Sequence, residues 1–95
     1  MDSAVMVGCY VVVRASAAGV HCGTLVCRMG QEVRLANARR IWSWTGAFTL
    51  NAVATDGVGE GSRLGVPVEL IDILDACEVI VCSTAARLSL EVAGS

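Results

Sequence analysis

The chain has 95 residues, of which 55% are hydrophobic, and its net charge of −2 combines seven basic residues, all arginine, with nine acidic residues. This length fits one small domain, taken as residues 1–95. The acidic balance argues against a broad surface for duplex nucleic acid, and no apolar run reaches the roughly 18 residues of a membrane-spanning helix. An apolar excess in so short a chain favours burial between subunits, so we expect a homo-oligomer that does not enter a membrane.

The N-terminal third of the sequence predicts three antiparallel strands. Residues Met6–Arg14 are rich in valine, which is typical of a strand buried on at least one face. A turn of small residues at 16–19 leads to a second strand, Val20–Met29, and a short turn then leads to a third strand, Glu32–Ala36. Short turns between successive strands indicate a meander.

Residues 37–46 contain both tryptophans of the chain and two of its arginines. Asn37 interrupts the alternation of the third strand, after which an extended segment resumes. Alternation predicts that one face of this segment carries Arg40, Trp42 and Trp44 and the other Arg39, Ile41 and Ser43. A guanidinium beside indoles can bind an anion and stack on a flat ring. The alternative is that the indoles belong to the core and the arginines to the solvated surface.

The second half of the sequence predicts two helices and two strands. Threonine or serine caps and glycine stops mark the helices. The glycine-rich residues 56–63, between the first helix and the two strands, predict a flexible loop. The expected elements are a helix between Thr49 and Gly57, strands Val66–Leu74 and Ala76–Cys82, and a closing helix Thr84–Val92 with Ala85, Leu88 and Val92 on its apolar stripe. The fold class is therefore α+β, a small antiparallel β-sheet of about five to six strands with one or two short helices.

Neither the cysteines nor the acidic residues predict a metal site. The cysteines are odd in number and form no CxxC pair, so we expect reduced, buried thiols in a cytosolic protein. The acidic residues of the last two strands are spread over both faces and the turn, which favours a solvated edge. These residues are Cys9, Cys22, Cys27, Cys77 and Cys82, and Glu69, Asp72, Asp75 and Glu78. We expect no metal and no cofactor.

His21 is the single histidine, and no motif links it to a nucleophile and a carboxylate. We therefore expect no catalytic residue and no enzymatic activity. A structural role in the second strand is the simplest interpretation. If His21 is functional, it is expected to donate to a phosphate or carbonyl on the same surface as Arg14.

Residues Ser16–Leu25 read SAAGVHCGTL and residues Asn37–Ala47 read NARRIWSWTGA, close to the pattern SAGV…GTL…NARRxWxWxGA. In this pattern the sequence resembles a family of short phage and prophage proteins of unknown function, and residues 66–69 and 82–84 extend the likeness. The chain departs from that family at Asn51 and Ala52 and in its additional cysteines. The resemblance implies a phage-encoded accessory protein made in the host cytoplasm, and it supplies no activity.

Small oligomeric phage proteins often sequester the nucleotide signals of host defence, and residues 37–46, called the Arg/Trp segment below, suit such a ligand. The resulting hypothesis is a non-enzymatic sponge for a cyclic dinucleotide or a molecule of the cyclic ADP-ribose type. The expected ligand-binding residues are Arg14, Ser16, His21, Arg39, Arg40, Trp42 and Trp44. The alternative is a phage structural or protein-interaction module whose Arg/Trp segment forms a subunit interface. A nucleotide hydrolase that uses His21 as an acid or base ranks third.

Overall fold

Three strands joined by short turns form the centre of the sheet in the computed structural model, which describes residues 6–94. They are β1 (Tyr10–Ala15), β2 (Gly19–Met29) and β3 (Glu32–Ser43). Both strand pairs are antiparallel, so the predicted meander is confirmed. The first strand begins at Tyr10, later than the expected Met6.

The rest of the chain adds three more strands and two helices, namely α1 (Leu50–Asp56), β4 (Arg63–Leu64), β5 (Val68–Ile73), β6 (Ala76–Val81) and α2 (Thr84–Val92). The sheet has six strands in the order β4-β3-β2-β1-β6, and β5 also pairs with β3. All pairs are antiparallel. The predicted α+β class is confirmed.

Strand β3 is longer than the sequence suggested. The two segments expected as separate strands, Glu32–Ala36 and Arg40–Trp44, belong to one strand that ends at Ser43. Asn37, with a φ of 51°, lies between them in the left-handed region, and the register with β2 shifts there. Such a bulge reverses which residues face inward. The expected interruption at Asn37 is therefore confirmed, but as a bulge within a continuous strand.

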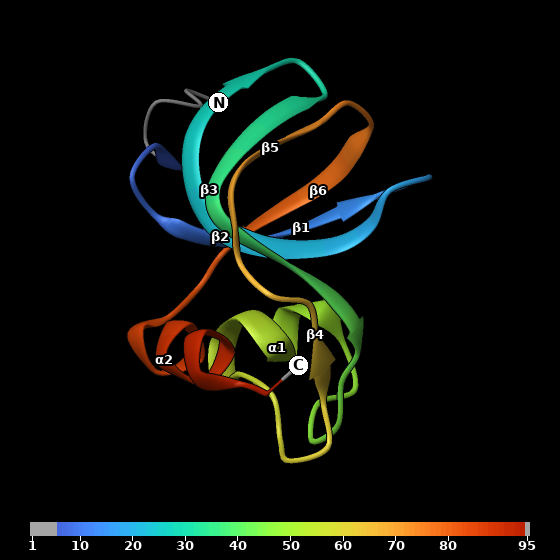
Figure 1. The fold of residues 1–95 in the computed structure, drawn as a ribbon, viewed down its shortest axis with the longest axis vertical. Helices are drawn as coiled ribbons and strands as arrows, with labels where there is room; N and C mark the ends of the chain where they lie inside the picture. The colour runs from blue at the N-terminus through green and yellow to red at the C-terminus, as the bar shows by residue number, and fades with distance from the viewer. Residues whose placement is uncertain (1–5, 95) are drawn as a thin grey trace.

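The sheet separates two apolar clusters of side chains. Figure 1 shows the curved sheet above and the two helices with β4 below. Strand β1 supplies both clusters because its side chains alternate between faces. The sheet-side cluster includes Val11, Val13, Leu25, Leu35 and Ile73. The helix-side cluster includes Tyr10, Val12, Ile41, Val53, Leu64 and Leu90. Strand β3 runs from the upper part to the lower part and so contributes to both (Figure 1).

The helices begin and end close to where their capping residues predict. The Thr49 hydroxyl accepts from the Ala52 amide, and Gly57 follows the end of α1; the Ser83 hydroxyl accepts from the Ala86 amide at the start of α2. The predicted apolar stripe of α2 is wrong, because Ala86 and Leu90 are its buried residues while Leu88 and Val92 are exposed.

A polar contact accompanies the burial of the Ala86 and Leu90 face of α2 in place of the predicted face. The Ser89 hydroxyl accepts from the Val58 amide at 3.0 Å and donates to the Val58 carbonyl at 3.0 Å. These bonds hold the side of α2 that contains Ser89 against the loop after α1, and Leu90 is buried beside it. The apolar pattern alone did not contain this constraint.

The described cysteines are all free, and three of them are buried or half-buried. The prediction of buried thiols is wrong for Cys27 and Cys77, which are exposed. Two of the acidic residues at the solvated edge form exposed ion pairs across neighbouring strands: Asp72 with Arg34 at 2.7 Å and Glu78 with Arg14 at 3.0 Å.

Candidate functional site

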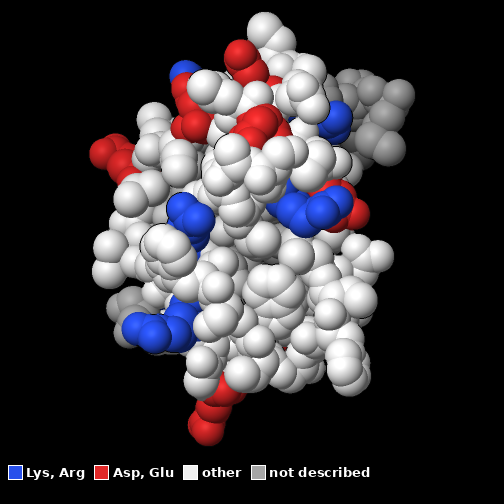
Figure 2. Space-filling model, turned by 90° about the vertical axis from the view of Figure 1, so that its right-hand side faces the viewer, with Lys and Arg blue, Asp and Glu red and all other residues white. Residues whose placement is uncertain are grey.

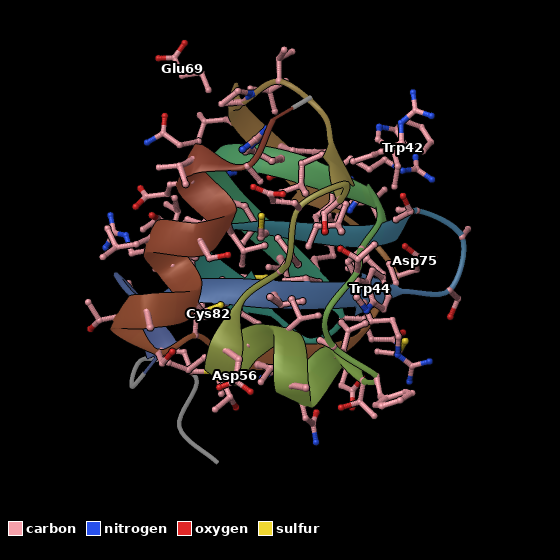
Figure 3. All side chains as sticks on the ribbon, turned by 90° about the horizontal axis from the view of Figure 1, so that it is seen from below. Trp42, Trp44, Asp56, Glu69, Asp75 and Cys82 are labelled. Carbon is pink, nitrogen blue, oxygen red and sulfur yellow. The ribbon has the colours of Figure 1, made fainter. Side chains whose placement is uncertain are left out.

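The Arg40 guanidinium lies over the ring of Trp42, with its central carbon 4.2 Å from the ring centroid. The two residues are two positions apart on β3, so alternation places them on the same face. Trp42 is 63% exposed, and Figure 3 shows it at the outer edge of the molecule. A cation–π contact at such an exposed site is worth about 0.5–1 kcal/mol. The pair therefore presents an aromatic surface and a positive charge to solvent.

Two glycines adjoin this pair. Gly19, at the start of β2, has a φ of +82°, and a Cβ there would approach Nη2 of Arg40 to 3.0 Å. The Gly65 amide donates to the Arg40 carbonyl at 2.7 Å, and a Cβ on Gly65 would lie 3.7 Å from Nε1 of Trp42. At Gly19 a side chain would therefore both strain the backbone and displace the guanidinium.

His21 lies beside Arg40 on the neighbouring strand. The two residues are directly paired in the β2–β3 register, and opposite residues in an antiparallel pair share a face. His21 is 5% exposed, and its Nδ1 has no hydrogen-bond partner among residues 6–94. Burial, and then the positive charge of Arg40, lower the pKa of His21 below its ordinary value. The imidazole is therefore neutral at neutral pH.

Arg39 points away from this surface. Its side chain is 5% exposed, its Nε donates to the Gly65 carbonyl at 2.7 Å, and its Nη1 donates to the Leu90 carbonyl at 2.8 Å. A guanidinium at the last carbonyls of a helix satisfies unpaired acceptors and opposes the helix dipole. Arg39 thus joins β3 to the end of α2, and it does not share the surface of Arg40 as a ligand contact would require.

Trp44 lies beyond the end of β3 and does not share the face of Trp42. Its Nε1 donates to the Ala47 carbonyl at 3.1 Å, and its ring is partly buried against the helix-side cluster. Figure 3 shows the two tryptophans well apart, with Trp44 close to the body of the molecule. The prediction of one face for both indoles is wrong, because the strand ends at Ser43 and the chain turns.

Arg14 and Ser16 are likewise separate from the Arg40–Trp42 pair. Arg14 is opposite Val20, which is opposite Ile41, so these residues share the face of the sheet that Arg40 does not occupy. Ser16 lies in the exposed β1–β2 turn, where its amide donates to the Asp75 carbonyl at 3.3 Å. Of the predicted ligand-binding residues, the structure brings together Arg40, Trp42 and His21.

Arg63 is a basic residue near Trp42 that the sequence did not indicate. It is exposed in β4 and pairs with Ser43 of β3. Trp42, Ser43 and Arg63 line an open hollow of about 410 Å³. A two-residue strand has no periodicity, so no pattern could have predicted that the loop after α1 returns to β3 at this point. We define the site surface as Arg40, Trp42 and Arg63, together with the buried His21 that pairs with Arg40 from β2. Both β3 and β4 thus contribute a positive charge to it, through Arg40 and Arg63.

Charges of both signs are scattered over an otherwise uncharged surface on the face that Figure 2 shows. No extended basic stripe of the kind that follows a nucleic-acid backbone is visible on that face. Within the described residues, no group of three or more His, Cys, Asp or Glu side chains is placed to hold a metal ion. None of the helices in residues 6–94 has the length and apolarity needed to cross a membrane.

These observations define a small α+β protein with an exposed arginine–tryptophan pair next to a buried histidine. Residues 8–90 match a family described as a domain of unknown function, DUF6948, and the chain belongs to this family. No curated protein matches the sequence, and no solved structure matches it.

Proposed function

We propose that this protein is a phage-encoded, non-enzymatic binding protein that sequesters a nucleotide-derived immune signal in the host cytoplasm. The observation that supports this proposal best is the Arg40 guanidinium held 4.2 Å from the centroid of the exposed Trp42 ring. An exposed indole offers a stacking surface for a base, and guanidinium groups bind phosphate oxygens. The likeness of the Arg/Trp segment to phage proteins supplies the biological setting.

The magnitudes of these contacts favour a site shared between copies of the chain. Stacking of one base contributes about 1–3 kcal/mol, and each charge-assisted bond from Arg40 or Arg63 about 1.5–3 kcal/mol. One base and two such bonds give roughly 4–9 kcal/mol, which lies within the cost of association of about 4–15 kcal/mol. One copy alone would bind weakly. A homo-oligomer that places two site surfaces against one ligand would bind tightly.

Calorimetric titration tests this proposal. Tag-free protein is titrated with cyclic di-AMP, cyclic di-GMP, cyclic GMP–AMP and cyclic ADP-ribose, with adenosine and guanosine as controls that lack phosphate. We expect one phosphate-containing ligand to bind, and Arg40→Ala or Trp42→Ala to weaken binding at least about tenfold, or 1.4 kcal/mol. Arg34→Ala is the matched control, because Arg34 pairs with Asp72 away from the site surface. Absence of binding by every ligand would reject the proposal.

Recovery of the ligand separates binding from hydrolysis. The complex is heated to denature the protein, and the released nucleotide is analysed by chromatography and mass spectrometry. A sponge returns the ligand unchanged. A hydrolase that uses His21 returns a cleaved product.

A protein-interaction role is the second candidate, and the exposure of Trp42 is what favours it. Val66 and Val68, in the segment that follows the Gly65 contact with Arg40, are also exposed. Apolar side chains gathered on a surface are typical of interfaces. Light scattering distinguishes the two: if Arg40→Ala and Trp42→Ala dissociate or unfold the protein, the interface role is correct.

A further inference from the structure

His21 presents an unused hydrogen-bonding atom beside the site surface. Its side chain is 5% exposed, and Nδ1 lacks a hydrogen-bond partner in the described part of the chain. Buried polar atoms in native proteins are nearly always paired, since an unpaired one costs about 1–3 kcal/mol. His21 is not one of the residues of the helix-side or sheet-side cluster. Its Nδ1 is therefore left without the polar partner that a buried nitrogen normally has.

The neighbours of His21 determine which ligand chemistry suits it. On β3 the residue paired with His21 is Arg40, and its guanidinium is positively charged. On β1 the paired residue is Val13, which is uncharged, and the adjacent Arg14 is on the opposite face, bound to Glu78. Asp75, in the β5–β6 turn, accepts from the Ala17 amide at the β1–β2 turn. The charge facing the imidazole is thus positive.

We propose that His21 and Arg40 form one anion subsite, in which a phosphate oxygen of the ligand accepts hydrogen bonds from both side chains and His21 takes up a proton as the ligand binds. This inference rests on the proposed function and specifies its ligand as one that carries a phosphate group close to a stackable base. The only covalent change is the transfer of one proton from solvent to the imidazole.

The physical reason for proton uptake is electrostatic. In the free protein, burial and the Arg40 charge both disfavour the imidazolium, which lowers the pKa of His21. An anion bound at Arg40 offsets that charge and supplies an acceptor, and each effect favours the imidazolium. Because linkage is reciprocal, a ligand that raises the pKa of His21 must bind more tightly as the pH falls.

Nuclear magnetic resonance of the imidazole tests the subsite directly. His21 is the single histidine, so a tag-free sample gives one set of ring signals. The ring is titrated from pH 5 to pH 8.5 in sodium sulfate and in sodium chloride of equal ionic strength, because sulfate keeps a constant charge over this range. We expect sulfate to raise the midpoint by about one unit or more, and Arg40→Gln to abolish the rise. An unchanged midpoint at the highest sulfate concentration would overturn the subsite.

Titration with the nucleotide distinguishes failure of the subsite from failure of the proposed function. A cyclic dinucleotide is suitable because its phosphodiesters do not titrate between pH 5 and pH 8.5. We expect affinity to rise about tenfold as the pH falls across this range, and His21→Gln to remove the pH dependence. A ligand that binds equally at all pH values refutes the subsite and leaves the sponge intact. A sulfate-dependent midpoint without any nucleotide binding supports the subsite and rejects the sponge.

Discussion

Arg39 and Arg40 are consecutive residues of β3, and their guanidinium groups serve opposite faces of the strand. Arg39 is buried, with Nη1 2.8 Å from the Leu90 carbonyl at the end of α2, whereas Arg40 lies over the exposed ring of Trp42. Gly65 connects them, because its carbonyl accepts from Arg39 at 2.7 Å and its amide donates to the Arg40 carbonyl at 2.7 Å. The same short segment therefore holds the helices in place and positions the exposed pair.

This arrangement predicts different effects for two neighbouring substitutions. Arg39→Ala removes charge-assisted bonds in a buried place and should lower the free energy of unfolding by about 3 kcal/mol. Arg40→Ala removes an exposed cation–π contact and should lower it by less than about 1 kcal/mol. Urea denaturation followed by circular dichroism measures both. Equal losses would mean that the two side chains do not have the separate roles described here.

A second prediction concerns Gly57, which ends α1 with a φ of 84° and a ψ of −157°. Only glycine adopts this region readily, and a Cβ there would overlap the side chain of Ser89. Gly57→Ala should therefore destabilise the protein by about 2–4 kcal/mol. Gly30→Ala is the matched control, because Gly30 has a φ of +61° but open space around it. This control should cost only about 1 kcal/mol, and thermal unfolding of both variants tests the difference.

The sequence predicted where the helices and strands lie in the chain better than it predicted which of their faces are buried. Alternation and capping residues located β2, β6 and both helices, since these patterns are local. The exposed face of α2 could not be predicted, because the Ser89 contact with Val58 that orients the helix joins residues far apart in the chain. Strand β4 was missed for a similar reason, as its two residues are defined by pairing with β3.

The site was predicted in part. Alternation correctly placed Arg40 and Trp42 on one face of an extended segment and Arg39 on the other. It could not show that the helices cover the Arg39 face, because that depends on how the end of α2 returns to β3. Trp44 was misplaced because the end of β3 at Ser43 is not marked by a breaking residue.

The stability of the protein should depend on His21 at mildly acidic pH. The pKa of His21 is lowered in the folded state by burial and by Arg40, whereas the unfolded chain has the ordinary value of about 6.5. As the pH falls through 6.5, the unfolded state binds a proton that the folded state resists, so the free energy of unfolding decreases. Urea denaturation at pH 7.5 and pH 5 should show a larger loss in the native protein than in His21→Gln. The carboxylates titrate in both proteins, so the comparison isolates the effect of His21. Equal losses in the native protein and in His21→Gln would contradict the lowered pKa of His21.

The helix caps offer a matched pair of substitutions. The Ser83 hydroxyl accepts from the Ala86 amide and also donates to the Thr55 carbonyl at 2.6 Å, so it caps α2 and links it to α1. The Thr49 hydroxyl caps α1 through the Ala52 amide. Thr49→Ala should cost about 1 kcal/mol, and Ser83→Ala about 1 kcal/mol more because a second hydrogen bond is lost. Chemical denaturation measures this order, and a larger loss for Thr49→Ala would contradict it.

Fluorescence of single-tryptophan variants tests whether the site surface is open in solution. In Trp44→Phe the emission comes from Trp42, which is 63% exposed and lies next to Arg40. We expect red-shifted emission that iodide quenches more strongly than caesium, because the guanidinium attracts the anion. In Trp42→Phe the partly buried Trp44 should emit further to the blue and resist both quenchers, and Arg40→Gln in the Trp44→Phe background should remove the preference for iodide. Blue-shifted and protected emission from Trp42 in an oligomeric protein would instead place the indole between subunits, and the interface role would then replace the sponge.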